Sequence, residues 1–580
     1  AGKEVVQVYF SAPDGALEKP YQELIAYGKT DELKPGESQI LTLSFSTDEM
    51  SSYSEDLAAY LMEDGEYVIR VGNSSRNTQV AGVVSLDADT VTEQLSNQLT
   101  IEDGKEELLN EKKLSNEGVT PYSYEGEEEE IASAKRIYLA SADFAAAPNN
   151  ASTLDDESVI TYYSENDLNS DSAKYKATGG WMTDKSTKET MVPVETSNEW
   201  TLLDVYNGRI SMEQFVAGLS IDQMSWIVNG VDVGTASTAG RSELGTYQYR
   251  DADTYQYTKA NGESTREGGN TLGWAALYTS GTVWASTPNY YNTLLIPSTD
   301  LSDGPAGARI TKTGTKDLYQ LVSPVEVAQN AEGDYYVAKE AEFNVLEDAT
   351  YYQYATAFPV GVLLAQTWNQ ELLERVGEAY GEEYVEFEMT YILGPGMNIH
   401  RTPLCGRNFE YYSEDPLVTG FTASAFTKGM QSKDGVGVTL KHFAGNNNET
   451  YRNYVNDVVS ERALREIYLK GFEIAVKAAQ PMAIMTSYNL INGQRTVNSY
   501  DLNTDILKEE WGFDGVVMSD YGAAGRAHAN EELGLNMWAN IMHSGNDWIM
   551  GGSTQSLTGD ASFASLLNAN GIMQGETGSD

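Results

Sequence analysis

The stretch Gly515-Val516-Val517-Met518-Ser519-Asp520-Tyr521 decides the fold of this chain. Its apolar residues lead into a serine and an aspartate, and the small residues Gly522 to Gly525 follow. A short apolar run bounded by glycines is typical of a buried strand. Asp520 would then lie at the carboxyl end of that strand, where α/β barrels and doubly wound sheets carry their chemistry. An aspartate there can be a nucleophile, a base, a metal ligand or a helix N-cap.

Other apolar runs end in polar residues in the same way, at Leu393–Asn398, Val438–His442 and Ala483–Asn489. Helical patterns such as Glu461–Leu469 lie between them, at the spacing of βα units. We therefore expect an α/β fold, a (β/α)8 TIM-type barrel over residues 201–580, with an open doubly wound sheet as the alternative. No GxGxxG or GxxxxGK[ST] motif follows these runs, which disfavours a nucleotide-binding sheet.

The first 90 residues have an all-β pattern. Strand-like runs occur at Glu4–Phe10, Ile40–Phe45 and Gly65–Val71, and Leu33–Glu37 has the residues of a turn. Short strands separated by Pro/Gly turns predict a β-sandwich over residues 1–90. Nothing before the first of these runs could supply earlier strands, so we expect the sandwich to be incomplete at its start.

Residues 91–200 are polar and include the acidic run Glu127–Glu130, so we expect an acidic polar connector or insertion. Over the 580 residues, 86 acidic side chains outnumber 38 basic ones, giving a net charge of −48. Such a charge repels phosphate backbones, so nucleic acid is not expected as a partner. No apolar run approaches the roughly 20 residues of a membrane span.

Cys405 is the single cysteine, and the four histidines form no ligand-spaced pair. We therefore expect neither an intrachain disulfide nor a metal site.

If the predicted strands surround one barrel, their polar ends converge on one pocket. Two loops add to it, Ser302–Arg309 with a carboxylate and Pro403–Glu410 with a cation. Acids, fixed cations and a phenol suit a ligand rich in hydroxyl groups. A nearby cation would also hold an aspartate ionised, as a nucleophile requires. The residues expected in the pocket are Asp303, Arg407, Lys441, His442, Tyr488, Asn489 and Asp520.

Two of these features have a purely structural alternative. Lys441-His442 is also typical of a lysine that reaches solvent beside a core histidine, and Arg407 with Glu410 is also typical of a structural ion pair. From the residues alone both alternatives stay open.

A series of short motifs occurs in order along residues 201–552, and together they resemble glycoside hydrolase family 3, of the β-glucosidase type. The motifs are Asp303-Gly304-Pro305 with Arg309, Gly394-Pro395-Gly396 with Asn398, Gly406-Arg407-Asn408-Phe409-Glu410 with Glu414-Asp415-Pro416, Lys441-His442-Phe443, Asn447-Asn448-Glu449 with Arg452, Ser460-Glu461-Arg462, Ser487-Tyr488-Asn489, Trp511-Gly512-Phe513, Ser519-Asp520-Tyr521 and Gly545-Asn546-Asp547. Residues 1–90 resemble the family's fibronectin type III-like domain, including Lys34–Glu37 and Val71–Ser75.

The resemblance implies a retaining exo-acting β-glycosidase without a cofactor, acting on terminal β-D-glucosyl residues of β-linked glucosides or short oligosaccharides. It implies Asp520 as the catalytic nucleophile. Tyr521 stands where the family often has tryptophan and would be a sugar platform. The remaining residues that the resemblance places in the substrate-binding subsite are Asp303, Arg309, Arg407, Lys441, His442, Arg452 and Tyr488.

A fibronectin type III-like domain before the barrel resembles the circularly permuted members of the family. In those members an α/β sandwich domain comes first and supplies the acid/base glutamate, and this sequence has no match for it. We therefore expect a fragment, short also at its end, with the sandwich domain encoded upstream. The sequence does not name the proton donor or the oligomeric state, and its acidic, Tyr/Asn/Ser-rich surface leans towards a secreted or cell-surface setting.

Three alternatives to a β-glucosidase remain. The first is a β-xylosidase or another family 3 exo-glycosidase. The second is a sugar-binding fragment without turnover, because the acid/base domain is missing. The third is an aldolase-like barrel enzyme with a Schiff base on Lys441, although nothing in the sequence marks a phosphate site.

Overall fold

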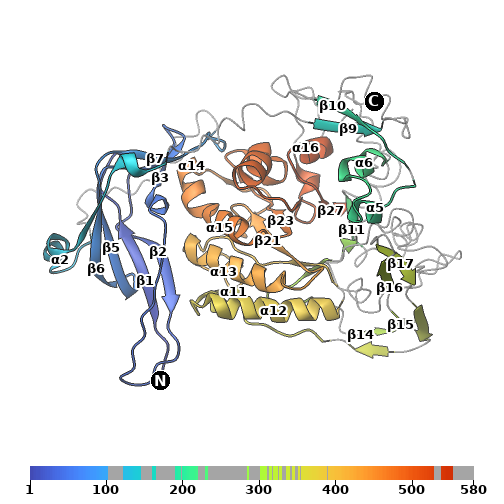
Figure 1. Cartoon of the computed structure of the whole chain (residues 1–580), viewed down its shortest axis with the longest axis horizontal. Helices are drawn as coiled ribbons and strands as arrows, with labels where there is room; N and C mark the ends of the chain where they lie inside the picture. The colour runs from blue at the N-terminus through green and yellow to red at the C-terminus, as the bar shows by residue number, and fades with distance from the viewer. Residues whose placement is uncertain are drawn as a thin grey trace.

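This computed structural model describes residues 1–101, 122–145, 160–164, 190–197, 199–219, 229–232, 284–285, 301–309, 313–315, 318–323, 326–329, 335–339, 342–346, 350–352, 354–387, 389–527 and 537–552. An N-terminal β-sandwich lies beside an α/β unit whose strands are flanked by helices (Figure 1). Among the described residues, no helix is both long enough and apolar enough to cross a membrane.

The sandwich consists of a five-stranded sheet and a three-stranded sheet. Its core is apolar, with Phe10, Met62 and Tyr67 at most 4% exposed. The predicted turn is present, since Glu37 N donates to Lys34 O at 2.9 Å. The larger sheet has the order β2 (Glu23–Lys29), β1 (Val5–Ser11), β5 (Gly65–Ser74), β6 (Asn77–Leu86) and β8 (Arg136–Leu139), and the smaller one β3 (Ser52–Ser54), β4 (Ala59–Met62) and β7 (Thr90–Gln94).

The sandwich departs from the sequence-based expectation in one strand. Residues 40–45 form no strand, so that prediction is wrong, and β2 occupies the place beside β1 instead. Leu43 and Phe45 still pack against the sandwich core, whereas Ile40 is 94% exposed. The period-two alternation therefore predicted correctly which of these side chains face the core. It did not predict whether the backbone pairs, because pairing depends on a neighbouring strand.

The sandwich also extends beyond residue 90. Strand β8 pairs in parallel with β6, from Val83 opposite Arg136 to Leu86 opposite Leu139. Helix α2 (Glu127–Ser133) carries the predicted acidic run, and Glu127 accepts from the buried Arg70 at 2.6 Å. Part of the predicted connector thus completes the first domain, because one of its acids pairs with a cation in the sheet rather than facing water.

Five parallel strands form the central sheet of the α/β unit. The predicted strands around Leu393, Leu440, Met485 and Val517 are confirmed, and β13 joins them. A parallel bridge from Met518 to Trp548 leads on towards β27, which pairs in parallel with β11. The order is β13 (Leu301–Asp303), β20 (Tyr391–Leu393), β21 (Gly437–Phe443), β23 (Ala483–Thr486) and β26 (Val516–Met518), followed by β27 (Ile549–Gly552) and β11 (Asn229–Asp232).

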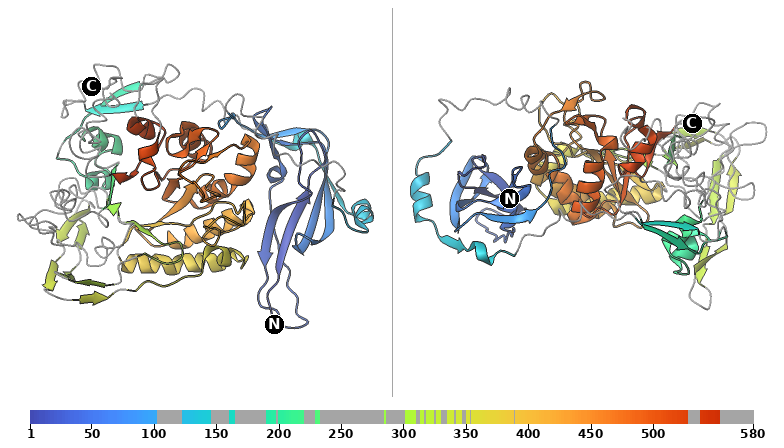
Figure 2. Two further views of the ribbon diagram at one scale, coloured as in Figure 1. Left: turned by 180° about the vertical axis from the view of Figure 1, so that it is seen from behind. Right: turned by 90° about the horizontal axis from the view of Figure 1, so that it is seen from above.

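Helices α12 (Gln370–Glu386), α13 (Pro416–Met430) and α15 (Lys470–Ala479) lie side by side against the sheet (Figures 1 and 2). Asp415 caps α13 by accepting from Val418 N at 2.9 Å, and a proline occupies the first helical position. A Cβ on Gly429 would lie 1.9 Å from Glu374 O, so glycine is what lets α12 and α13 approach this closely.

The predicted helix at residues 461–469 is divided into α14 (Glu461–Ala463) and a π-helical turn, η3 (Leu464–Tyr468), before α15. Two short helices follow residue 201, α5 (Leu202–Tyr206) and α6 (Met212–Ala217). The remaining elements are η1 (Asp48–Met50), η2 (Ser141–Asp143), β9 (Ile160–Ser164), β10 (Thr190–Val194), β12 (Trp284–Ala285), β14 (Thr313–Thr315), β15 (Leu318–Ser323), β16 (Glu326–Gln329), β17 (Tyr335–Lys339), β18 (Glu342–Leu346), β19 (Thr350–Tyr352), α11 (Gly361–Ala365), β22 (Asn456–Asp457), β24 (Leu490–Ile491), β25 (Gln494–Arg495), η4 (Thr496–Asn498), η5 (Asp501–Glu510), η6 (Ala524–Arg526) and α16 (Met537–His543).

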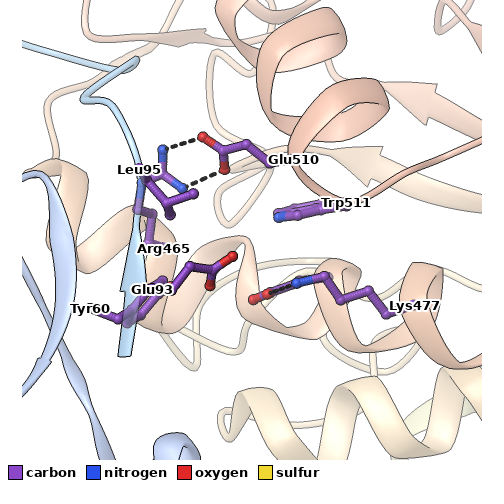
Figure 3. Close-up of a pocket in the computed structure, with 8 residues that line it drawn as sticks. Tyr60, Glu93, Leu95, Arg465, Lys477, Glu510 and Trp511 are labelled. Carbon is purple, nitrogen blue, oxygen red and sulfur yellow. Dashed lines mark hydrogen bonds and ion pairs between the residues drawn. The ribbon is translucent and has the colours of Figure 1, made fainter. Parts of the chain in front are cut away.

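A buried charge network joins the sandwich to the α/β unit. Arg465 makes two bonds to Glu510, of 2.7 and 3.0 Å, beside Tyr60 and Leu95 of the sandwich (Figure 3). Arg465 also donates to Glu461 at 3.0 Å and to Ser96 O at 3.1 Å. Because these side chains are only 2–3% exposed, the contact is an integral part of the fold.

Candidate active site

The carboxyl ends of the parallel strands bring the predicted residues together. Asp303 ends β13, Lys441 and His442 belong to β21, and Asp520 follows β26. Lys441 Nζ lies 3.2 Å from Asp303 Oδ1, and His442 Nε2 lies 3.6 Å from Asp520 Oδ2. Residues that are 138 and 78 positions apart in sequence, respectively, thus form one cluster.

Asp303 is paired with two cations. Its Oδ1 faces Lys441, and its Oδ2 accepts from Arg309 Nη1 at 3.1 Å. Burial opposes ionisation of Asp303, but the charges of Lys441 and Arg309 outweigh it and leave the pKa of this carboxyl below its usual range. Asp303 is therefore an ionised acceptor near neutral pH.

Arg407 is both an ion-pair partner and a member of the cluster. Its guanidinium binds Glu410 through two bonds, Nε to Oε2 at 2.8 Å and Nη2 to Oε1 at 2.7 Å. Its Nη1 also lies 2.9 Å from His442 Nε2. Glu410 Oε1 in turn is 3.8 Å from Lys441 Nζ. The structural ion pair is present, and it orients a cation within the pocket.

His442 is held neutral. Burial, followed by the charges of Arg407 and Lys441, places the pKa of His442 well below its ordinary value. With Arg407 donating to Nε2, the proton lies on Nδ1, which faces Tyr411 Oη at 3.2 Å and Asn398 Oδ1 at 3.4 Å. The proximity of His442 to Asp520 is thus a polar contact rather than an ion pair.

Asp520 lies at the centre of the cluster with a side chain 7% exposed. Its Oδ1 accepts from Tyr521 N at 2.6 Å, whereas its buried Oδ2 has no hydrogen-bond partner among the described residues. Burial raises the pKa of Asp520, and the Tyr521 N–H, Lys441 and Arg407 offset this only in part. The sequence led us to expect that nearby cations hold this carboxyl ionised, and in the structure burial outweighs them.

Asn489 was also expected in the pocket, but its side chain donates instead to Ala444 O at 3.1 Å and to Asp457 Oδ2 at 2.9 Å. Tyr488 and Arg452 are linked by contacts to Tyr521, the residue after Asp520. Tyr488 Oη donates to Tyr521 O at 2.8 Å, and the Arg452 guanidinium lies 4.8 Å from the centre of the Tyr488 ring. Burial and then the Asp520 charge raise the pKa of Tyr488, so its phenol stays protonated. The Tyr521 side chain packs against the apolar cluster that contains Met518, and both of its main-chain polar groups make hydrogen bonds.

Sequence reasoning did not place Tyr411 and Asn446 in the pocket, although it did place the acids Glu410 and Glu449 in the pocket loops. Asn446 donates to Tyr411 Oη at 2.9 Å and to Glu449 Oε1 at 2.9 Å, and Glu449 accepts from Arg452 at 2.7 Å. Together with Glu410 they hold Arg407, His442 and Arg452 in place. The available signal was their position next to motif residues, since Tyr411 follows Glu410 directly and Asn446 precedes Asn447-Asn448-Glu449.

Comparison with known proteins decides the family. Residues 348–566 match the glycosyl hydrolase family 3 N terminal domain, and residues 4–75 match the fibronectin type III-like domain. The chain belongs to glycoside hydrolase family 3.

Among its relatives, β-glucosidase A of Butyrivibrio fibrisolvens is 33% identical over 564 residues, which is 96% of this chain and 52% of the relative. An exo-α-(1→6)-L-arabinopyranosidase of Bifidobacterium longum is 53% identical over 183 residues, 32% of this chain and 24% of the relative. A solved β-glucosidase from Paenibacillus barengoltzii aligns over 99% of this chain and 50% of its own, with a TM-score of 0.64 and 29% identity. This family 3 chain therefore spans about half the length of the Butyrivibrio and Paenibacillus proteins.

Proposed function

We propose that this family 3 chain carries the catalytic centre of a retaining exo-acting β-glycosidase, with Asp520 as the nucleophile. The observation that carries the proposal is the buried, unpartnered Asp520 Oδ2, surrounded by groups that can bind hydroxyls. Because this oxygen accepts no hydrogen bond from the described residues, it is available to bond an anomeric carbon. We also propose that the curved run of parallel strands belongs to a (β/α)8 barrel, which would place Asp520 at its functional face.

The other residues would bind the sugar at the non-reducing end. Ionised Asp303 would accept from two adjacent hydroxyl groups, while Lys441 and Arg407 donate to them. Neutral His442 offers a hydrogen-bonding ring beside Asp520, and Tyr488 and Arg452 would add a phenol and a guanidinium next to Tyr521. Arg309 supports Asp303, and the Tyr521 side chain would serve as the platform for the sugar ring.

In the proposed reaction, Asp520 Oδ2 attacks the anomeric carbon as the bond to the leaving oxygen breaks, and an acid gives that oxygen a proton. Water then attacks the glycosyl-enzyme, the same group takes a proton from the water, and the Asp520 carboxylate is regenerated. A retaining mechanism requires the two carboxyl groups to lie about 5 to 5.5 Å apart.

Two acids near the pocket are poorly suited to donate that proton. Glu410 is bonded twice to Arg407, and Glu449 accepts from both Arg452 and Asn446, so the oxygens of both carboxyl groups are already engaged within the chain. We propose instead that the proton donor belongs to an α/β sandwich domain outside this chain. The greater length of the relatives is consistent with this proposal. Without such a domain, the chain would bind sugars but turn over only substrates whose leaving group needs no proton.

A β-linked glucoside is the favoured substrate, because the two relatives aligned over nearly the whole chain are named β-glucosidases. A pentose glycoside is the second candidate, since the 53% identity to an L-arabinopyranosidase falls within a shorter segment. Rates with the nitrophenyl β-glucoside, β-xyloside and α-L-arabinopyranoside separate the two. Higher kcat/KM for either pentoside would contradict the glucoside assignment.

The nucleophile is tested by covalent labelling. The probe is a 2-deoxy-2-fluoro-β-glucosyl donor whose dinitrophenyl or fluoride leaving group departs without needing a proton. The fluorine at position 2 slows hydrolysis of the glycosyl-enzyme intermediate, so that the intermediate accumulates. We expect peptide mapping by mass spectrometry to find the label on Asp520 alone. Label on Glu410, Glu414 or Asp303 would overturn the assignment. If the complete protein stays unlabelled and its Asp520→Asn variant binds glucose as well as the parent does, the protein binds sugars without turning them over.

A further inference from the structure

A cavity of about 330 Å³ lies behind the loop that follows β21. Gly445, Asn447 and Asn448 line it, whereas Asn446, between them, turns to Tyr411 and Glu449 of the candidate site. The loop is therefore a wall with the candidate site on one side and the cavity on the other. None of the predicted site residues lines this cavity.

The cavity contains one cation and one carboxylate. Asp457, from β22, accepts from Asn489 Nδ2 at 2.9 Å. Burial raises the pKa of Asp457 to about 6, while Asn489 and the charge of Arg401 act in the opposite direction. At neutral pH the cavity thus offers a carboxylate acceptor and, from Arg401, several N–H donors. Because the cavity is lined by one positive and one negative side chain, it suits a neutral ligand better than an ion.

The rest of the wall is partly amide and partly apolar. Asn447 and Asn448 add polar groups, and Asn447 is fixed by donating to Ile399 O at 2.6 Å. Val459 and Ile491 supply an apolar surface. Donors, acceptors and an apolar patch in one space suit a ring that has hydroxyls at its edge and C–H groups on its face. A volume of about 330 Å³ is at the small end of the roughly 300–1,000 Å³ of ligand sites, which suits a monosaccharide.

We propose that this cavity is a second binding site, selective for a neutral monosaccharide, and separate from the site that contains Asp520. Arg401 would donate to hydroxyl oxygens of the sugar, Asp457 would accept from its hydroxyls, and Val459 with Ile491 would contact its apolar face. The proposal does not require turnover, so it stands apart from the proposed hydrolase activity.

The test uses glucose titrated by calorimetry into the full chain carrying Asp303→Ala, which removes the main acceptor of the first site. We expect this variant to retain glucose binding. Adding Arg401→Ala should weaken that binding at least tenfold, and adding Asn448→Trp, at an exposed residue, should block the cavity. The control is Arg375→Ala on the exposed face of α12, which removes the same charge and should leave binding unchanged.

Two results would overturn the proposal. One is loss of all glucose binding in the Asp303→Ala variant, provided that thermal unfolding shows this variant to be folded and that the Asp520→Asn variant also binds no glucose. The other is unchanged binding after both cavity substitutions. If glycine binds the cavity and glucose does not, the ligand is a zwitterionic amino acid and the sugar assignment is wrong. Hydrolysis assays on the parent chain are scored separately, so loss of turnover leaves the outcome of the titration intact.

Discussion

Arg407 connects Glu410 to His442: its guanidinium holds the Glu410 carboxylate through two bonds and donates to His442 Nε2 at 2.9 Å. This arrangement fixes the tautomer of His442, whose ring lies 3.6 Å from Asp520. A planar cation with several donors can make all these bonds at once, whereas an ammonium group cannot.

We therefore expect Arg407→Lys to reduce activity even though it preserves charge. Loss of a hydrogen bond to a charged group costs about 1.5–3 kcal/mol, which corresponds to roughly a 10- to 100-fold fall in kcat/KM. The measurement is steady-state hydrolysis of a nitrophenyl glycoside by the complete enzyme. Arg375→Lys on α12 is the matched control, and equal activity of both variants would show that the bidentate geometry is unimportant.

Asp303→Ala should remove the charge-assisted bonds to the sugar. The expected loss of transition-state binding is roughly 2–4 kcal/mol. The melting temperature should fall only by what the lost Asp303 ion pairs contribute, because Glu410 remains 3.8 Å from Lys441. Kinetics and thermal unfolding of the purified complete enzyme check both parts. Full activity would mean that the sugar subsite has been placed wrongly.

The pH profile should report Asp520. Attack needs the ionised carboxylate, so activity is lost as pH falls through the pKa of Asp520, which burial raises above the ordinary value of about 3.9. Arg407 lowers this pKa, so Arg407→Gln should move the acid limb of kcat/KM to higher pH, while Arg407→Lys should leave it in place. If the parent, Arg407→Gln and Arg407→Lys all lose activity at the same acid pH, the titrating group is not Asp520.

The pKa of Asp303 is shifted in the opposite direction to that of Asp520, and this shift should make the folding stability depend on pH. Its folded-state pKa is lowered, so its ion pairs contribute stability above the pKa of the unfolded chain. That contribution is lost as pH falls through the lower folded-state pKa. The parent should therefore lose more unfolding free energy between neutral and acid pH than Asp303→Asn does. Urea titrations at a series of pH values give the comparison, and parallel pH curves would contradict the lowered pKa.

The interface network predicts a large effect of Arg465→Met. The substitution leaves Glu461 and Glu510, each 2% exposed, without their buried cation, which typically costs about 3–5 kcal/mol. Urea unfolding measures this loss. Arg462→Met, on the neighbouring residue, is the control: its pair with Glu466 is about one-fifth exposed and should be worth less than about 1 kcal/mol. Similar losses for both would mean that burial of the network does not matter.

The sequence by itself determined the strands that end near Leu393, His442 and Asp520. A short apolar run bounded by glycines is too short for a buried helix and is typical of a buried strand. Motif residues also identified most of the cluster. Alternation at residues 40–45 misled us, since a backbone forms a strand only where another strand is free to pair with it.

Only the tertiary structure decided what depends on distance and burial. Asp303 and Lys441 are 138 residues apart, and nothing local in either segment encodes their 3.2 Å contact. The raised pKa of Asp520 likewise depends on how completely distant segments exclude water from it, so the cations that sequence reasoning counted could not be weighed against desolvation. The roles of Tyr411 and Asn446, and the cavity behind their loop, follow from the same three-dimensional packing.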